Sequence, residues 1–130
     1  MTADSSSRSR AAPLPAAEYA ALTSAVLDCV ETTIDRWLEG DVIDIDAHRT
    51  GGLLELTLPD RSKLIVNTQP PLQELWLAAK SGGFHFRFVG ATWCDTKDGR
   101  EFFEVLSICA SAQSGQTLTF LPPVPPVPLA

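Results

Sequence analysis

Seven carboxylates stand close together in the first third of this sequence. The stretch from residue 28 to residue 46 holds seven acids and one base, Arg36, which gives it a net charge of −6. The other nine acids and nine bases balance, so these nineteen residues carry the whole net charge of the chain. The acids are Asp28, Glu31, Asp35, Glu39, Asp41, Asp44 and Asp46.

This pattern of acids predicts a cation-binding surface. Carboxylate oxygens are hard ligands that suit Mg²⁺, Ca²⁺, Mn²⁺ and iron, whereas zinc favours Cys and His clusters that the sequence lacks. Acids three or four residues apart on a helix lie about 5–6 Å from one another, so pairs can share an ion with water. The alternative is a solvated face that only maintains solubility. Like charges at this spacing destabilise a helix, and only Arg36 is interspersed, which weakens the case for a merely solvated face.

Several classes of protein are disfavoured by the composition. A nucleic-acid-binding protein needs a basic stripe, and no apolar run approaches the roughly 18 residues that cross a membrane. Three cysteines, Cys29, Cys94 and Cys109, lack CxxC spacing and indicate reduced, mostly buried thiols. Residues 1–15 lack the apolar core of a secretory signal. Asp4 and the lack of an amphipathic repeat weigh against a mitochondrial presequence, so we expect the cytoplasm rather than the mitochondrial matrix.

The 130 residues, 45% of them apolar, suit one domain. We expect a disordered tail over 1–15, a domain over 16–121 and a Pro-rich tail over 122–130. A helix is predicted to begin with Pro15 at its first position and to end at Gly40. Its buried face is formed by six apolar residues at steps of three and four, namely Tyr19, Leu22, Val26, Val30, Ile34 and Trp37. At about 100° per residue, the helical acids fall on a separate side.

Alternating residues predict several antiparallel strands after this helix. Residues 42–48 read as a strand, with Asp44 and Asp46 on the side away from the isoleucines. Residues 53–58 and 62–67 form a hairpin, residues 84–89 form a half-buried strand, and Trp93 lies in another. The segment 72–80 is either a strand or a single turn.

A second helix follows, with Asp98 and Glu101 resembling a capping box at its start. The order predicts an α+β fold, a two-layer sandwich with both helices on one face of the sheet.

Each of three aromatic residues can be interpreted in two ways: Trp76, His85 and His48. A tryptophan in an apolar run is usually core, but the polar neighbours Gln73 and Glu74 and the preceding prolines make an exposed position the alternative. His85 and Arg87 should share the outer face of the strand at 84–89, and His85, with no carboxylate partner in view, reads as solvated. His48 is the better candidate for joining Asp46 in a metal site.

Several stretches together resemble the frataxin family, most closely its bacterial members. They are SKLIVNTQ at 62–69, Pro71-Leu72, LWLA at 75–78, KSGGFHF at 80–86, Trp93 and the helix opening at 99–103. The resemblance runs from Tyr19 to Phe120. It implies two helices packed on one face of an antiparallel sheet of five to seven strands.

The resemblance also implies a function in iron–sulfur cluster assembly. Such proteins bind iron weakly through acids of the first helix and strand, and other divalent cations can substitute. They act as iron donor or regulator with a cysteine desulfurase and a scaffold protein, without catalytic residues. The expected state is a monomer, with iron-driven oligomerisation as an alternative. Ferroxidase activity is a third hypothesis for the function. Asn67, Gln69 and Trp76 match the family's partner-binding surface.

Two points qualify this expectation. Thr32 and Arg36 stand where many bacterial members have acids, so the surface should bind fewer ions or bind them more loosely. A competing function is that of an acidic adaptor, which modulates the desulfurase by protein contact while iron binding is incidental.

Overall fold

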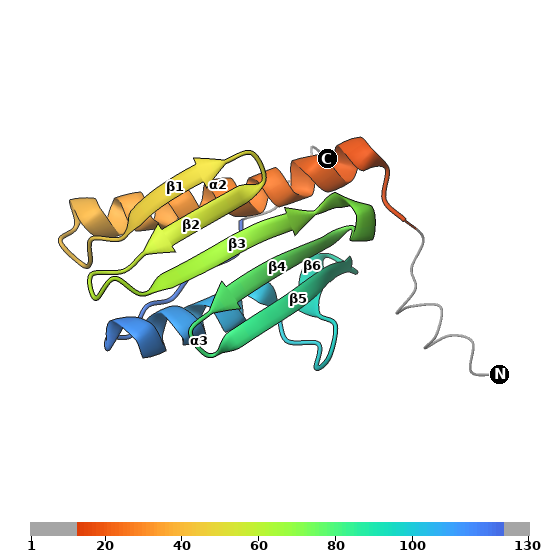
Figure 1. Cartoon of the computed structure of the whole chain (residues 1–130). Coiled ribbons are helices and arrows are strands. Elements are labelled where there is room, and N and C mark those ends of the chain that lie inside the picture. The colour runs from red at the N-terminus through yellow and green to blue at the C-terminus, as the bar shows by residue number, and fades with distance from the viewer. Residues whose placement is uncertain (1–12, 124–130) are drawn as a thin grey trace, which may run out of the picture.

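The computed structural model describes residues 13–123, which form a six-stranded antiparallel sheet with two long helices on one of its faces (Figure 1). The strands follow one another across the sheet in chain order, from β1 to β6. The elements are α2 (Ala16–Glu39), β1 (Asp46–Thr50), β2 (Leu53–Thr57), β3 (Lys63–Gln69), η1 (Pro70–Leu72), β4 (Glu74–Ala79), β5 (Gly82–Val89), β6 (Thr92–Asp95) and α3 (Phe102–Ser114). The predicted two-layer α+β sandwich is confirmed, and its strand number lies within the expected range.

The core lies between the sheet and the two helices. Buried and more exposed residues alternate along β2 and β3, from Leu75 along β4, and from Phe84 to Phe88 in β5, which is the pattern of a sheet with one covered face. Each fully buried leucine or phenylalanine contributes about 1.5–3 kcal/mol. The residues that meet in this layer include Val26, Val30, Ile34, Leu54, Leu56, Leu64, Val66, Leu75, Leu77, Phe86, Phe102 and Leu106. No helix within residues 13–123 is long and apolar enough to cross a membrane.

Tyr19 connects the start of α2 to the last residue of β3 and the first residue of β4. Its hydroxyl donates to the backbone oxygen of Glu74 at 2.6 Å and accepts from the backbone N–H of Gln69 at 3.0 Å. These bonds fix the connection between the two strands, which contains η1. The open alternative for residues 72–80 is thereby resolved: a short 3₁₀ turn is followed by strand β4.

The strand predicted over 42–48 is wrong at its beginning, because β1 starts only at Asp46. Asp46 pairs with Thr57, the last residue of β2. An earlier start would need partners at Leu58 and Pro59, but proline has no N–H for the ladder, and Leu58 already donates to Ser62 in the turn. Asp44 therefore lies in the connection between α2 and β1.

The predicted capping box is also wrong, since Glu101 is itself the N-cap of α3. Its carboxylate accepts from the backbone N–H groups of Phe103 at 2.9 Å and Glu104 at 3.1 Å. Asp98 instead binds Arg100, through the backbone N–H at 2.9 Å and through Nε at 3.0 Å. The sequence signal was real but was placed three residues too early.

Residues after α3 return along the helices. The hydroxyl of Ser111 accepts from the N–H of Leu118 at 2.9 Å, and that of Ser107 accepts from the N–H of Phe120 at 2.8 Å. Phe120 is buried against Trp37 of α2, with ring centroids 4.7 Å apart. The predicted tail over 122–130 lies outside the described residues from 124 onward, and that over 1–15 lies outside them up to residue 12.

Replacing Glu101 with Ala should lower the free energy of unfolding by about 1 kcal/mol, because two N–H groups at the start of α3 lose their acceptor. Asp98→Ala is the matched control and should have a smaller effect, since its partner Arg100 lies outside the helix. Urea unfolding of both variants tests the assignment. A larger loss for Asp98→Ala would restore the capping box predicted from sequence.

Candidate cation-binding ridge and open sheet face

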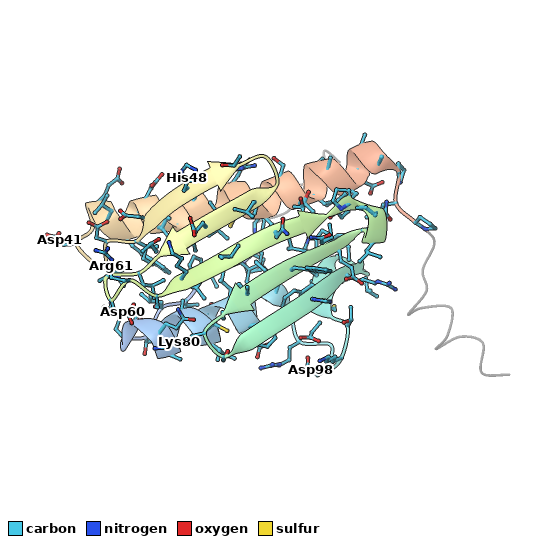
Figure 2. The ribbon with its side chains drawn as sticks, in the orientation of Figure 1. Asp41, His48, Asp60, Arg61, Lys80 and Asp98 are labelled. Carbon is cyan, nitrogen blue, oxygen red and sulfur yellow. The ribbon has the colours of Figure 1, made fainter. Side chains whose placement is uncertain are left out.

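The seven predicted metal ligands follow one continuous path along the molecule, which we call the acidic ridge. Asp28, Glu31, Asp35 and Glu39 lie on α2, Asp41 and Asp44 in the connection, and Asp46 at the start of β1. Six of the side chains are exposed, and that of Glu31 is half-buried. Asp41, with a φ of 58°, projects from the molecule at the end of α2 (Figure 2).

One end of the ridge already holds a cation, the guanidinium of Arg49. Its Nη1 lies 2.6 Å from Asp28 Oδ1 and 2.7 Å from Glu31 Oε1, and its Nη2 lies 3.3 Å from Ser24 Oγ. Arg49 pairs with Leu54 across β1 and β2, so its side chain is on the helix-covered face and reaches α2. These two carboxylates raise the pKa of Arg49 above its ordinary value, chiefly through the hydrogen bonds they accept.

Sequence reasoning missed Arg49 because it counted only bases inside the acidic stretch. The available signal was strand alternation: a residue facing the same way as buried Leu54 must point toward α2. The pairing leaves one net negative charge on Asp28, Glu31 and Arg49 together. The other five carboxylates of the ridge form no ion pair within residues 13–123.

The ridge is not a preformed chelating site. In the described part of the chain, no group of three or more His, Cys, Asp or Glu side chains could hold a metal ion. A cation on the ridge would therefore be held by one or two carboxylates, with water completing its shell. His48 (labelled in Figure 2) lies on β1 on the same side as Asp46, but the one hydrogen bond of its ring among residues 13–123 is with the Thr50 hydroxyl, at 3.3 Å.

The second surface is the face of the sheet that carries no helix, which we call the open face. Cross-strand pairing places Asn67 opposite Trp76 and Trp76 opposite His85. In the adjacent row, Gln69 is opposite Glu74. The three residues predicted for partner contact, Asn67, Gln69 and Trp76, are all half-buried and lie together on this face.

Glu74 is the residue of the open face that sequence reasoning missed. Its side chain is only 9% exposed, although it lies on the side of the sheet away from the helices. Its Oε1 accepts from Trp76 Nε1 at 2.8 Å, and its Oε2 lies 3.2 Å from Arg87 Nε. His85 Nδ1 lies 3.7 Å from Oε1, so the expectation that His85 has no carboxylate nearby is wrong.

The ring of His85 also stacks on the indole of Trp76. Their centroids are 4.1 Å apart, and their planes differ by only 4°. The carboxylate was hidden in the sequence because Glu74 and His85 are eleven residues apart and meet only through the register of β4 and β5. The open face thus contains a connected group of one acid, two bases and one indole.

Known proteins resemble this chain in sequence and in fold. A family profile described as the frataxin-like domain matches residues 12–116. The chain belongs to the frataxin-like family. A Polaromonas protein named iron-sulfur cluster assembly protein CyaY is 52% identical over 108 residues, which cover 83% of this chain and 93% of that protein.

Solved structures of the family share the fold. Frataxin from Psychromonas ingrahamii is 31% identical and has a TM-score of 0.73, covering 83% of this chain and 99% of that one. Trimeric yeast frataxin, in a structure described as complexed with ferrous iron, is 23% identical with a TM-score of 0.61, covering 72% of this chain and 86% of that one. The suspected family is therefore confirmed.

Removing the guanidinium of Arg49 should make the free energy of unfolding more dependent on salt. Arg49→Ala leaves Asp28 and Glu31 unpaired on adjacent turns of α2, which should lower the free energy of unfolding by about 1 kcal/mol at low salt. The difference from wild type should shrink as NaCl screens the repulsion. Urea unfolding at low and high NaCl measures both effects.

The matched control is Arg36→Ala, since Arg36 lies on the same helix and forms no ion pair among residues 13–123. Equal losses of stability in the two variants would show that Arg49 acts only through general charge and not through its two contacts.

Proposed function

We propose that this chain is an iron-binding protein of iron–sulfur cluster assembly, which acts as iron donor or regulator for a cysteine desulfurase and its scaffold protein. The observation that carries this proposal is the acidic ridge, set on a fold whose 52% identical relative is named an iron–sulfur cluster assembly protein. Since that relative is bacterial, we propose the bacterial cytoplasm as its location.

The ridge has the properties that a temporary iron site needs. Five of its carboxylates have no ion-pair partner in the described chain, and their oxygens are ligands for Fe²⁺ and Fe³⁺. With no enclosed site, iron binds weakly, exchanges easily and competes with other divalent cations. The proposed ligands remain the seven acids, with Asp35, Glu39, Asp41, Asp44 and Asp46 favoured over the two that bind Arg49.

We propose no catalytic residue. A ferroxidase would hold its irons with several inward carboxylates and histidines, as di-iron proteins do. The described residues contain no such group. The protein acts as a monomer that presents its ridge to solvent, and iron shared between the ridges of two molecules is the route by which it could oligomerise.

A second function is favoured by the open face. An adaptor that modulates the desulfurase by contact alone needs an exposed aromatic anchor and polar groups beside it, which Trp76, Asn67 and Gln69 supply. In this case the ridge would bind a basic surface of the desulfurase, and iron would be incidental.

Neutralising Asp35 and Asp44 together separates these two functions. The Asp35→Asn, Asp44→Asn double variant should lose most ferrous iron binding, measured by anaerobic calorimetry, because both acids belong to the unpaired part of the ridge. Desulfurase activity with the scaffold present is measured on the same preparation. The assay is run with and without ferrous iron. If wild type changes desulfurase activity equally in both conditions and the double variant loses that effect, the adaptor function is correct, whereas an effect that requires iron supports the iron-binding function.

Asp28→Asn serves as the control for a change of one charge at the occupied end of the ridge. It should alter iron binding much less, since Asp28 already binds Arg49. An equal loss in this control would contradict the favoured set of five ligands.

Cations should stabilise the folded protein by two separable routes. Added NaCl screens repulsion along the ridge, whereas Ca²⁺ at the same ionic strength should raise Tm further, because it binds the folded state. Differential scanning fluorimetry at matched ionic strength makes the comparison. Identical Tm values in NaCl and CaCl₂ would contradict specific binding of divalent cations.

A further inference from the structure

We propose that Glu74 and His85, with Arg87 behind them, are positioning residues that hold the indole of Trp76 in one orientation on the open face, ready for a protein partner. The inference rests on the proposed function, because the partner in question is the one that would contact Trp76. It adds a mechanism, since the anchor is fixed before the partner arrives.

Two contacts at different parts of the indole restrict its motion. The parallel ring of His85, 4.1 Å away, fixes the plane of the indole. The hydrogen bond of 2.8 Å from Nε1 to Glu74 fixes the direction of the N–H edge within that plane. A side chain with only two χ angles has little freedom left after both contacts are made.

Glu74 is itself held by two contacts besides the one with Trp76. Its second carboxylate oxygen lies 3.2 Å from Arg87 Nε, and its backbone oxygen accepts from the Tyr19 hydroxyl, which belongs to α2. A carboxylate that is nine-tenths buried is costly unless it is paired with a charge and hydrogen-bonded, and here both conditions are met. The acceptor for the indole is therefore fixed to Arg87 of the sheet through its carboxylate and to α2 through its backbone.

A rigid acid this deep in an otherwise solvated face is more than solubility requires. An ordinary open-face residue of an antiparallel sheet is polar and free to move. The group of Glu74, His85 and Arg87 instead converges on one aromatic side chain. Its physical consequence is that a partner does not have to immobilise Trp76, which is worth about two- to tenfold in Kd.

The neighbours of Trp76 indicate the chemistry of the partner. The side-chain amides of Asn67 and Gln69 form no hydrogen bond that the structure shows within residues 13–123, so their donors and acceptors are available. Amides beside an oriented indole suit a polypeptide surface that presents an apolar group to the ring and peptide groups to the amides.

The orientation of Trp76 can be measured directly, without a partner. We would record ¹⁵N relaxation and solvent exchange of the indole N–H groups, assigning Trp76 with Trp76→Phe. His85→Ala should lower the order parameter of the Trp76 indole, and His85→Phe, which keeps a flat ring, should restore it. Glu74→Met, which keeps volume but has no acceptor, should speed exchange of the indole N–H about tenfold. Thr57→Ala on the same face is the control, and the indoles of Trp37 and Trp93 should not change.

Binding is then measured to the complex of cysteine desulfurase and scaffold protein. Trp76→Ala should weaken binding more than tenfold with little change in Tm. His85→Ala should weaken it about two- to tenfold, while His85→Phe and Thr57→Ala bind like wild type.

The outcomes separate the proposed partner surface from the positioning of Trp76. Wild-type binding by Trp76→Ala would refute the partner surface in the proposed function, while the NMR data would still judge the positioning. An indole that stays ordered in both His85→Ala and Glu74→Met would overturn the positioning inference, whatever the binding shows. An indole that becomes mobile in His85→Ala without any loss of affinity would overturn its role in binding.

Discussion

Burial of only one face of the sheet is the constraint on which the other features depend. Both long helices cover the same side, so the alternating apolar residues of β2 to β5 form one core, and the alternate residues remain on the open face (Figure 1). The same arrangement leaves the outer side of α2 in solvent. The two proposed functional surfaces are therefore the two parts of the molecule that this packing does not use.

The two surfaces differ in how their charges are compensated. On the ridge, Arg49 offsets two carboxylates at one end, and the other five repel one another across solvent. On the open face, Glu74 is buried and fully engaged by Trp76 and Arg87. Exposed carboxylates without a paired base favour weakly bound ions that exchange with solvent. A buried carboxylate that is paired and hydrogen-bonded favours a fixed side-chain conformation. The chemistry proposed for each surface follows from this difference.

The features that depend on local periodicity could be predicted from the sequence. The face of α2, its end at Gly40 and the β2–β3 hairpin all follow from spacing that short segments carry by themselves. The start of β1 could not be found this way, because it depends on Leu58 and Pro59, which lie in the turn between β2 and β3. The N-cap of α3 was misplaced because Asp is a favoured N-cap residue and Glu is not. In the structure the Asp95 N–H donates to the Arg100 oxygen, so Asp98 lies in the turn before the helix.

The sequence did not reveal Arg49 and Glu74 as site residues, and both were missed for the same reason. Arg49 meets Asp28 and Glu31 across 21 and 18 residues of sequence, and Glu74 meets Arg87 across 13. Such pairs are set by strand register, and a shift of one residue would send Arg49 to the open face and Glu74 into the core. These contacts add to the apolar pattern in favouring the observed register. Moving Glu74 inward would bury an unpaired carboxylate, so the contact that orients Trp76 also penalises the wrong pairing of β4 with its neighbours.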